Sequence, residues 1–367
     1  MRVIFQSRRT LFSVPGGDTI QIIQTAAELR ALGCLVDICT DLETDLSAYD
    51  VVHLFNLTRP QELLMQIRHA RERGKKIVLS TIYVDFLEYE RLARKGMGRF
   101  AARLLPHSTI EYSKTIARAI KNGEMHRGVM HYLACGHPSA QREIIRSTDL
   151  FMPNSEHEMQ RVIADFPDAA GKPYLVVPNA VDESLFGSLS AIDTVHRDSI
   201  LCVARIEGRK NQLHLVRAMR DLPWKLMLIG QPAPNHGRYY NEIRKIAGAN
   251  VHIRGEVPHE QLPAYYGAAR VHVLASWMET TGLSSLEAGA MGCNLVITDK
   301  GDTREYFGDS AFYCDPSSVQ SIRDAIVKAF NSPVEPELRN RILRDYVWRR
   351  AAEKTLEGYE LILSLSD

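Results

Sequence analysis

The sequence predicts an α/β protein with two doubly wound domains, each a parallel sheet wrapped by helices and facing the other across a cleft. The chain has 367 residues, which exceeds one ordinary domain and is enough for two. Short apolar runs alternate with stretches of helical periodicity near the N-terminus, and a second such series begins at residue 199. Hydrophobic residues make up 45% of the chain and charged residues 24%, so each half can bury a core.

The first series of elements runs to about residue 80. We expect strands at residues 3–5, 35–38, 50–54 and 76–80, with helices at 20–31 and 60–73. A helical, basic stretch interrupts the series between about residues 86 and 136. Apolar runs at 150–153 and 175–178 then resume it.

The second series predicts strands at residues 199–203, 226–229, 251–253, 271–274 and 295–297, again with helices between them. The weakly periodic segment 182–197 is the linker candidate. We therefore divide the chain into residues 1–184, residues 185–345 and a terminal helix at 346–367. Ligands of such sheets bind at the carboxyl ends of the strands, so the cleft between the domains is the expected active site.

Composition excludes several classes of protein. The formal net charge of +1 gives no sign of nucleic-acid binding. None of the six cysteines forms a C-x-x-C pair, which favours a reducing compartment over a disulfide framework or a zinc ribbon. No apolar run reaches the roughly 20 residues that span a bilayer, and the start does not read as a signal peptide. We expect a cytoplasmic protein.

The most informative stretch follows the strand at 271–274. A loop carries Glu279, and a helix that begins near Gly282 and Leu283 carries Glu287 on its second turn. The free N–H groups of a helix N-terminus receive phosphate oxygens, whereas carboxylates accept hydrogen bonds from hydroxyls. The expected ligand thus has phosphates in its middle and hydroxylated rings at both ends, as a nucleotide diphosphate-sugar has. A helix cap and a solvated carboxylate would explain either glutamate alone, but not the pair in this setting.

A cationic cluster follows the strand at 199–203. Arg205 can grip a diphosphate bidentately, and Lys210 supplies a point charge. A departing diphosphate needs such cations or a metal, and no metal-ligand spacing occurs here. We therefore expect no metal and no cofactor. A surface basic turn that caps the next helix explains this cluster equally well when it is considered alone.

Together with two further segments, these residues resemble the GT-B glycosyltransferases of family 4, the retaining group. Glu279 and Glu287 match the family's pair of glutamates, and Arg205 and Lys210 match its cationic pair. The segment Pro178-Asn179-Ala180-Val181-Asp182 is similar to the family's interdomain Pro-Asn-Gly-Val-Asp, and Tyr346-Val347-Trp348 to the start of its terminal helix, which crosses back to the first domain. Gly16 and Gly17 stand where the family has an N-terminal glycine loop. The resemblance covers nearly the whole chain.

The resemblance implies a role for each residue of the second domain's site. Glu287 would hold the ribose hydroxyls, and Glu279 would contact the transferred sugar. Arg205 and Lys210 would hold the diphosphate of a UDP- or GDP-sugar while the sugar leaves. Retention in the family proceeds by front-face displacement, in which the leaving phosphate oxygen takes the proton of the acceptor.

The resemblance also implies donor contacts from backbone and motif residues. Gly282 and Leu283 would offer N–H groups, Gly16 and Gly17 would allow close approach to the donor phosphates, and Asn179 belongs to the donor-binding set. The family often carries a His-Asp pair after the fourth strand. Here Tyr83 and Asp85 stand near those positions, as contacts for sugar or acceptor.

Several alternatives remain open from the sequence. The expected acceptor is a glycan or a lipid-linked saccharide, and the basic stretch 91–127 is either a patch for anionic membrane or a solvated helix face. A nucleotide-sugar epimerase of the same fold would release no new glycoside. A nucleotide-sugar-binding protein without catalysis would not need both intact charged pairs. A nicotinamide-dependent oxidoreductase is a weaker alternative, because no strand–GxGxxG–helix is present.

Overall fold

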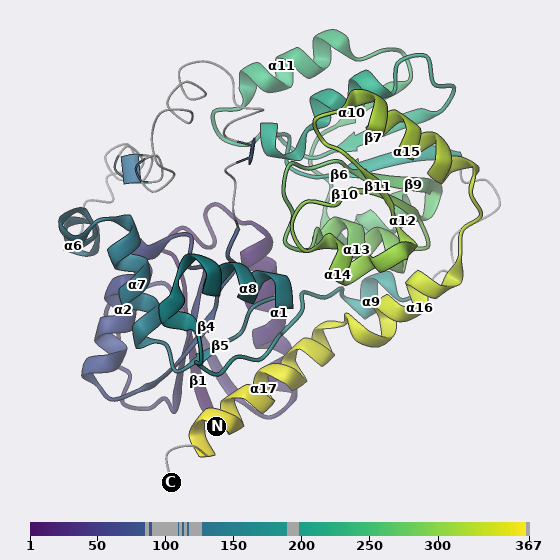
Figure 1. The fold of residues 1–367 in the computed structure, drawn as a ribbon. Coiled ribbons are helices and arrows are strands. Elements are labelled where there is room, and N and C mark those ends of the chain that lie inside the picture. The colour runs from purple at the N-terminus through teal and green to yellow at the C-terminus, as the bar shows by residue number, and fades with distance from the viewer. Residues whose placement is uncertain are drawn as a thin grey trace. The chain divides into compact units, whose positions relative to one another are not determined.

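The fold is taken from a computed structural model, which describes residues 1–84, 88–89, 109, 112–113, 116, 127–188 and 198–364. The chain divides into two compact units (Figure 1). Unit 1 comprises Met1–Val84, Phe100–Asn179 and Trp348–Asp367, and unit 2 comprises Asp85–Arg99 and Ala180–Val347. The main chain thus passes to unit 2 after Asn179 and returns at Trp348.

Unit 1 contains a five-stranded sheet in the order β2-β1-β3-β4-β5, in which every recorded pair is parallel. Its strands are β1 (Arg2–Gln6), β2 (Leu35–Cys39), β3 (Val51–Phe55), β4 (Lys76–Ser80) and β5 (Leu150–Phe151). The middle strand β3 is buried along its whole length. Such a continuous apolar strand is typical of a sheet with helices on both faces.

The helices of unit 1 include one from the C-terminal end of the chain. They are α1 (Gly17–Ala31), α2 (Pro60–Glu72), α6 (Arg127–Cys135), α7 (His137–Ser147), α8 (Glu156–Asp165) and α17 (Trp348–Ser364), with a 3₁₀ turn at Pro167–Ala169. The yellow helix α17 packs beside the purple α1, although almost the whole sequence separates them (Figure 1). Its Gly358 lies against β5 and the residue that follows, where an added Cβ would stand 2.3 Å from Cε of Met152 and 3.0 Å from Cδ2 of Leu150.

Unit 2 contains a six-stranded sheet in the order β11-β10-β9-β6-β7-β8, again parallel throughout its recorded pairs. The strands are β6 (Ser199–Val203), β7 (Lys225–Ile229), β8 (Val251–Arg254), β9 (Ala269–Leu274), β10 (Asn294–Thr298) and β11 (Phe312–Cys314). Two apolar clusters fill the space between this sheet and its helices.

The helices of unit 2 are α9 (Glu183–Phe186), α10 (Gln212–Ala218), α11 (Gly237–Ile246), α12 (Leu262–Ala268), α13 (Leu283–Ala290), α14 (Thr303–Phe307), α15 (Val319–Asn331) and α16 (Pro336–Asp345). Short 3₁₀ turns occur at Gly208–Lys210, His259–Gln261 and Gly308–Ser310. Gly289 lets α13 lie close to α16, since a Cβ there would stand 2.6 Å from Cδ1 of Ile342. The small residues of α13 therefore serve its contact with another helix as well as with the sheet.

Three details differ from the expectations. Residues 175–178 form no strand. Tyr174 makes one bridge to Phe151, Leu175 donates to the Phe151 carbonyl and Val177 donates to the Pro153 carbonyl, but Pro153 has no N–H to donate in return. The expected linker contains the short helix α9, because the Asp182 side chain accepts from the N–H groups of Ser184 and Leu185. The short edge strand β11 was not expected at all.

Candidate functional site

The charged loops of unit 2 meet at the point where the strand order of its sheet reverses. From β6 the chain continues to β7 and β8 on one side, whereas β9, β10 and β11 lie on the other side. The loops that follow β6 and β9 therefore start at neighbouring strand ends and lead to opposite sides of the sheet. Ligands of open α/β sheets generally bind at such a position. Arg205 and Lys210 follow β6, and Glu279 follows β9.

An ion pair joins these two loops. Nζ of Lys210 lies 2.5 Å from Oε1 of Glu279, and the side chain of Glu279 is only 8% exposed. Asn211 fixes the first loop, since its left-handed backbone (φ 59°) is stabilised by side-chain donation to the carbonyls of Ala275 and Pro316. An ammonium group has three donors, so Lys210 can hold Glu279 and still bond a phosphate oxygen.

Arg205 lies on the same loop, and its side chain is exposed. Nearby Glu207 is buried and lies 3.2 Å from the guanidinium of Arg209. Burial alone would raise the pKa of Glu207, but the charges of Arg209, Arg205 and Lys210 outweigh it and lower the pKa. The loop thus carries one buried carboxylate among three cations, which leaves it with net positive charge.

The backbone of Glu279 is held from the loop after β10. Its N–H donates to the carbonyl of Lys300, and its own carbonyl accepts from the N–H of Asp302. Gly301 between them has φ +90°, and an added Cβ would stand 2.0 Å from the Glu279 carbonyl oxygen. Only glycine fits there, so the position of Glu279 depends on Gly301.

Helix α13 begins directly after this loop, as the sequence predicts. Gly282 precedes its first residue, Leu283, with a left-handed backbone (φ 77°, ψ 75°). The first turn contains no acidic residue. Its N-terminal N–H groups and the helix dipole are therefore not neutralised by a carboxylate of the same turn, and they suit an anion.

Glu287 is buried on the second turn of α13, with both carboxylate oxygens engaged. Its Oε1 lies 2.8 Å from Nε2 of His259, and its Oε2 accepts from the hydroxyl of Tyr266 at 2.8 Å. The hydrogen bond to Glu287 raises the pKa of His259, against the opposing effect of burial. Each carboxylate oxygen accepts at two positions, so Glu287 can still accept from a ligand hydroxyl.

The glycines of unit 1 lie at the N-terminus of α1, but the setting there differs. Gly16 precedes the helix with extended backbone, and Gly17 is its first residue. Asp18 stands in the first turn, where its carboxylate forms a double contact with the Arg8 guanidinium at 2.8 and 3.0 Å. Burial raises the pKa of Asp18, yet hydrogen bonding and charge from Arg8 prevail and lower it. A carboxylate thus already occupies the positive end of α1.

The remaining residues of unit 1 that the sequence singles out lie as follows. Tyr83 donates its hydroxyl to Oδ2 of Asp165 at 2.7 Å, and Asn179 is buried where the chain leaves the unit. Asp85 lies outside the described residues, as does most of the basic stretch 91–127. His53 is buried between the hydroxyls of Tyr359 and Ser80, and burial lowers its pKa to about 3, in keeping with a structural histidine.

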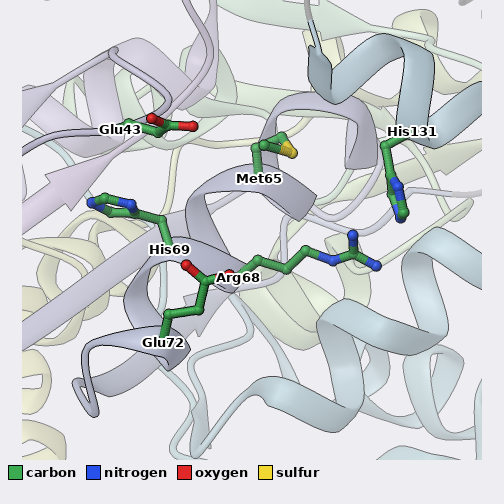
Figure 2. Close-up of a pocket in the computed structure, with 6 residues that line it drawn as sticks. All are labelled: Glu43, Met65, Arg68, His69, Glu72 and His131. Atoms are coloured by element: carbon green, nitrogen blue, oxygen red, sulfur yellow. The ribbon is translucent and has the colours of Figure 1, made fainter.

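A separate pocket of roughly 290 Å³ opens on α2 in unit 1. Met65, Arg68, His69 and Glu72 line it from α2, with Glu43 and His131 completing the wall (Figure 2). Arg68 is already paired with Glu143, and Nε2 of His69 bonds the Thr44 carbonyl. The pocket shares no residue with the predicted donor site.

Two properties of the described part of the chain bear on cofactors and membranes. Within it, no three His, Cys, Asp or Glu side chains come together as a metal site. No helix of the same part has the length and apolar character needed to cross a bilayer.

Two doubly wound α/β units of this kind, with charged residues and a helix N-terminus at the strand ends of the second, define the GT-B fold. Solved structures share this fold over the whole chain. Sucrose-phosphate synthase from Thermosynechococcus elongatus superposes with a TM-score of 0.73 at 15% identity and covers 100% of both chains. The Anabaena protein HepE in complex with UDP-glucose superposes with a TM-score of 0.66 at 14% identity, covering 97% of this chain and 98% of that one.

Sequence comparison places unit 2 in a family. Residues 195–345 match the family described as glycosyl transferases group 1. The chain thus has the GT-B fold, and its residues 195–345, which include Arg205, Lys210, Glu279 and Glu287, are similar to the group 1 glycosyl transferases.

Curated relatives match this chain at about a quarter of the aligned positions. O-antigen chain mannosyltransferase B of Escherichia coli is 26% identical over 44% of this chain and 45% of its own length. Alpha-maltose-1-phosphate synthase of Mycolicibacterium smegmatis is 24% identical over 99% of this chain and 100% of that protein. The chain thus spans about half the length of the E. coli relative, but the full length of the mycobacterial one.

Sequence reasoning missed the residues that hold the site together. His259 and Tyr266 contact Glu287 but lie 28 and 21 residues before it in the sequence. Neither belongs to a sequence motif that predicts the contact. One signal was available for His259, because it follows β8 and so lies beyond a strand's carboxyl end.

Proposed function

We propose that this protein is a retaining, metal-independent glycosyltransferase that takes a hexose from a UDP- or GDP-sugar. One observation carries the proposal: the Lys210–Glu279 ion pair joins the strand-end loops of β6 and β9 at the switch point of the sheet. The open N-terminus of α13 follows one of these loops directly. Cations, free N–H groups and carboxylates are thus assembled within one unit.

Each part of this assembly has a task in the transfer. Arg205, Lys210 and the N–H groups near Gly282 and Leu283 stabilise charge that grows on the diphosphate as the glycosidic bond breaks. Glu279 contacts the transferred sugar, and its pairing with Lys210 joins the sugar site to the diphosphate site. Glu287 accepts hydrogen bonds from the ribose hydroxyls. The leaving phosphate oxygen takes the acceptor proton, so no enzymic nucleophile is required.

The acceptor is a glycan or a lipid-linked saccharide, and the protein acts in the cytoplasm or at the inner face of the membrane. The E. coli relative's name, O-antigen chain mannosyltransferase B, supports an acceptor of a bacterial surface polysaccharide. The basic stretch 91–127 is the proposed contact with anionic membrane. Recovery on liposomes only when they carry anionic lipid, and less of it in high salt, would support that contact.

The experiment is a hydrolysis and transfer screen over a panel of UDP- and GDP-sugars, each assayed with and without EDTA. We expect turnover of one donor class, unchanged by chelation. Turnover that disappears in EDTA and returns with Mg²⁺ or Mn²⁺ would contradict the metal-independent mechanism. Interconversion of the nucleotide sugar without a new glycoside would instead identify an epimerase.

A further inference from the structure

Both oxygens of the Glu287 carboxylate are held by aromatic residues from outside helix α13. His259 comes from the loop after β8, and Tyr266 from α12. Each lies 2.8 Å from a different oxygen of Glu287. Two partners on two oxygens fix the rotation of the carboxylate plane as well as its position, which a single partner would not do.

In these two hydrogen bonds Glu287 is the acceptor, and Tyr266 and His259 are the hydrogen-bond donors. Tyr266 is fully buried next to Glu287, and burial together with that charge raises the pKa of its hydroxyl well above the usual value. The hydroxyl therefore remains protonated at every physiological pH and donates to Glu287. The side chain of His259 is one-third exposed, whereas Tyr266 is fully buried.

A third ring holds both partners in place. Phe186 of α9 is fully buried and contacts His259 edge to face at a centroid distance of 5.3 Å, and Tyr266 at 6.0 Å. Helix α9 is itself capped by Asp182, which lies shortly after the point where the chain enters unit 2. Edge-to-face packing of this kind defines ring orientation and adds stability beyond the buried area.

We propose that His259 and Tyr266 are positioning residues, which orient Glu287 so that it recognises the ribose of the donor nucleotide and rejects a deoxyribose. The inference rests on the proposed function, since it assigns a cause to the ribose recognition given there to Glu287. A carboxylate with fixed orientation discriminates against a missing hydroxyl, because its unmet lone pair stays buried. A carboxylate that can rotate relaxes and loses this discrimination.

The test compares the affinities of ribo and deoxyribo nucleotides by calorimetry, using UDP and GDP and their 2′-deoxy and 3′-deoxy forms. For the wild type we expect a preference for a ribo form on the order of tenfold, as for loss of one hydrogen bond to a charged group. Tyr266→Phe keeps the ring against Phe186 and removes only the hydroxyl, and its preference should fall to about two-fold. His259→Ala should lower the preference similarly, and His259→Gln, which retains a donor, should restore part of it.

Tyr313→Phe is the matched control. Its hydroxyl donates to the Gly308 carbonyl at 2.7 Å within the same unit, with no recorded contact to Glu287. The Tyr313→Phe variant loses one hydrogen bond, as Tyr266→Phe does. It should nevertheless keep the wild-type preference for the ribo nucleotide. A general loosening of the fold would instead lower both variants alike. His259→Ala provides the same comparison if Tyr266→Phe does not fold.

The outcomes separate the two claims. A wild type that prefers the ribo form, with the same preference in Tyr266→Phe and His259→Ala, would overturn the positioning role and leave the proposed function intact. A wild type that binds ribo and deoxyribo forms equally would remove Glu287 from the ribose site. A wild type that binds none of these nucleotides would overturn the proposed function itself.

Discussion

Helix α1 of unit 1 and helix α13 of unit 2 are both preceded by a glycine, Gly16 and Gly282, but they present different N-termini. The first turn of α1 contains Asp18, which Arg8 holds through two contacts of 2.8 and 3.0 Å. The first turn of α13 has no acidic residue. The dipole of α1 is therefore already compensated within the protein, whereas that of α13 is open to a ligand anion. A glycine before a helix thus does not by itself identify a phosphate site.

The largest expected effect concerns the cations beside the open helix. Arg205→Ala should lower kcat on the order of 100-fold, because a preorganised cation stabilises the departing diphosphate. The side chain is exposed, so the melting temperature should hardly change. The measurement is kcat with the identified donor, alongside a melting curve for the same variant.

Arg217→Ala serves as the control, since Arg217 is a partly exposed arginine of α10 that pairs with Glu242. Its turnover should stay near the wild-type value. Lys210→Ala is the less clean variant, because it also leaves the buried Glu279 without its ion-pair partner. Near-normal turnover in both Arg205→Ala and Lys210→Ala would place the diphosphate elsewhere.

Asp18→Asn tests the other side of the comparison. The substitution weakens a largely buried contact with Arg8, so the free energy of unfolding should fall by about 2 kcal/mol. Nucleotide affinity should not change if α1 supplies no phosphate contact. Urea unfolding and calorimetry with UDP and GDP measure the two quantities. A change in nucleotide affinity on the order of tenfold in Asp18→Asn would mean that α1 also binds the donor.

Glu287→Ala should weaken the binding of the nucleotide diphosphate on the order of tenfold, through loss of hydrogen bonds to the ribose. The buried position next to Tyr266 means that some stability is lost too, so a melting curve must show a folded variant. Unchanged affinity for both UDP and GDP would remove Glu287 from the ribose role.

The framework of both sheets was predictable because its strands carry uninterrupted apolar runs. Strand β4 has the expected bounds, and β6 matches to the residue, since each is a single short run between polar segments. Strand β11 (Phe312–Cys314) is also a short apolar run, and the prediction missed it. Residues 175–178 have the apolar content of a strand, but Pro153 opposite them has no N–H to donate to the ladder.

The site was predictable only where its residues are close in sequence. Glu279, Gly282 and Glu287 lie on one loop and one helix, so their relation follows from local structure. The contacts of Glu287 with His259 and Tyr266 depend on how α12 and the β8 loop pack against α13, which is a tertiary property. The same holds for Asp18, whose pairing with Arg8 decides whether its helix can receive an anion.

The smallest expected effect is a pH dependence of stability from His259. Glu287 raises its pKa, with smaller contributions from the charges of Asp182 and Glu260. The stabilisation is therefore complete below the ordinary value of 6.5, and it is lost as the pH rises through the folded-state pKa. His259→Gln should be less stable than the wild type by roughly 0.5 kcal/mol at pH 5.5, and the difference should vanish at pH 8.5. Urea unfolding at both pH values measures it, and a difference that grows with pH would contradict this account.

The central claim is that the donor diphosphate binds at the open N-terminus of α13, beside the loop that follows β6. A crystal structure of the wild-type protein with bound UDP or GDP tests it most directly. We expect the diphosphate against the backbone N–H groups of Gly282 and Leu283, with Arg205 and Lys210 within hydrogen-bonding distance and Glu287 on the ribose. A diphosphate held instead at Gly16 and Gly17, with the N-terminus of α13 empty, would contradict the account.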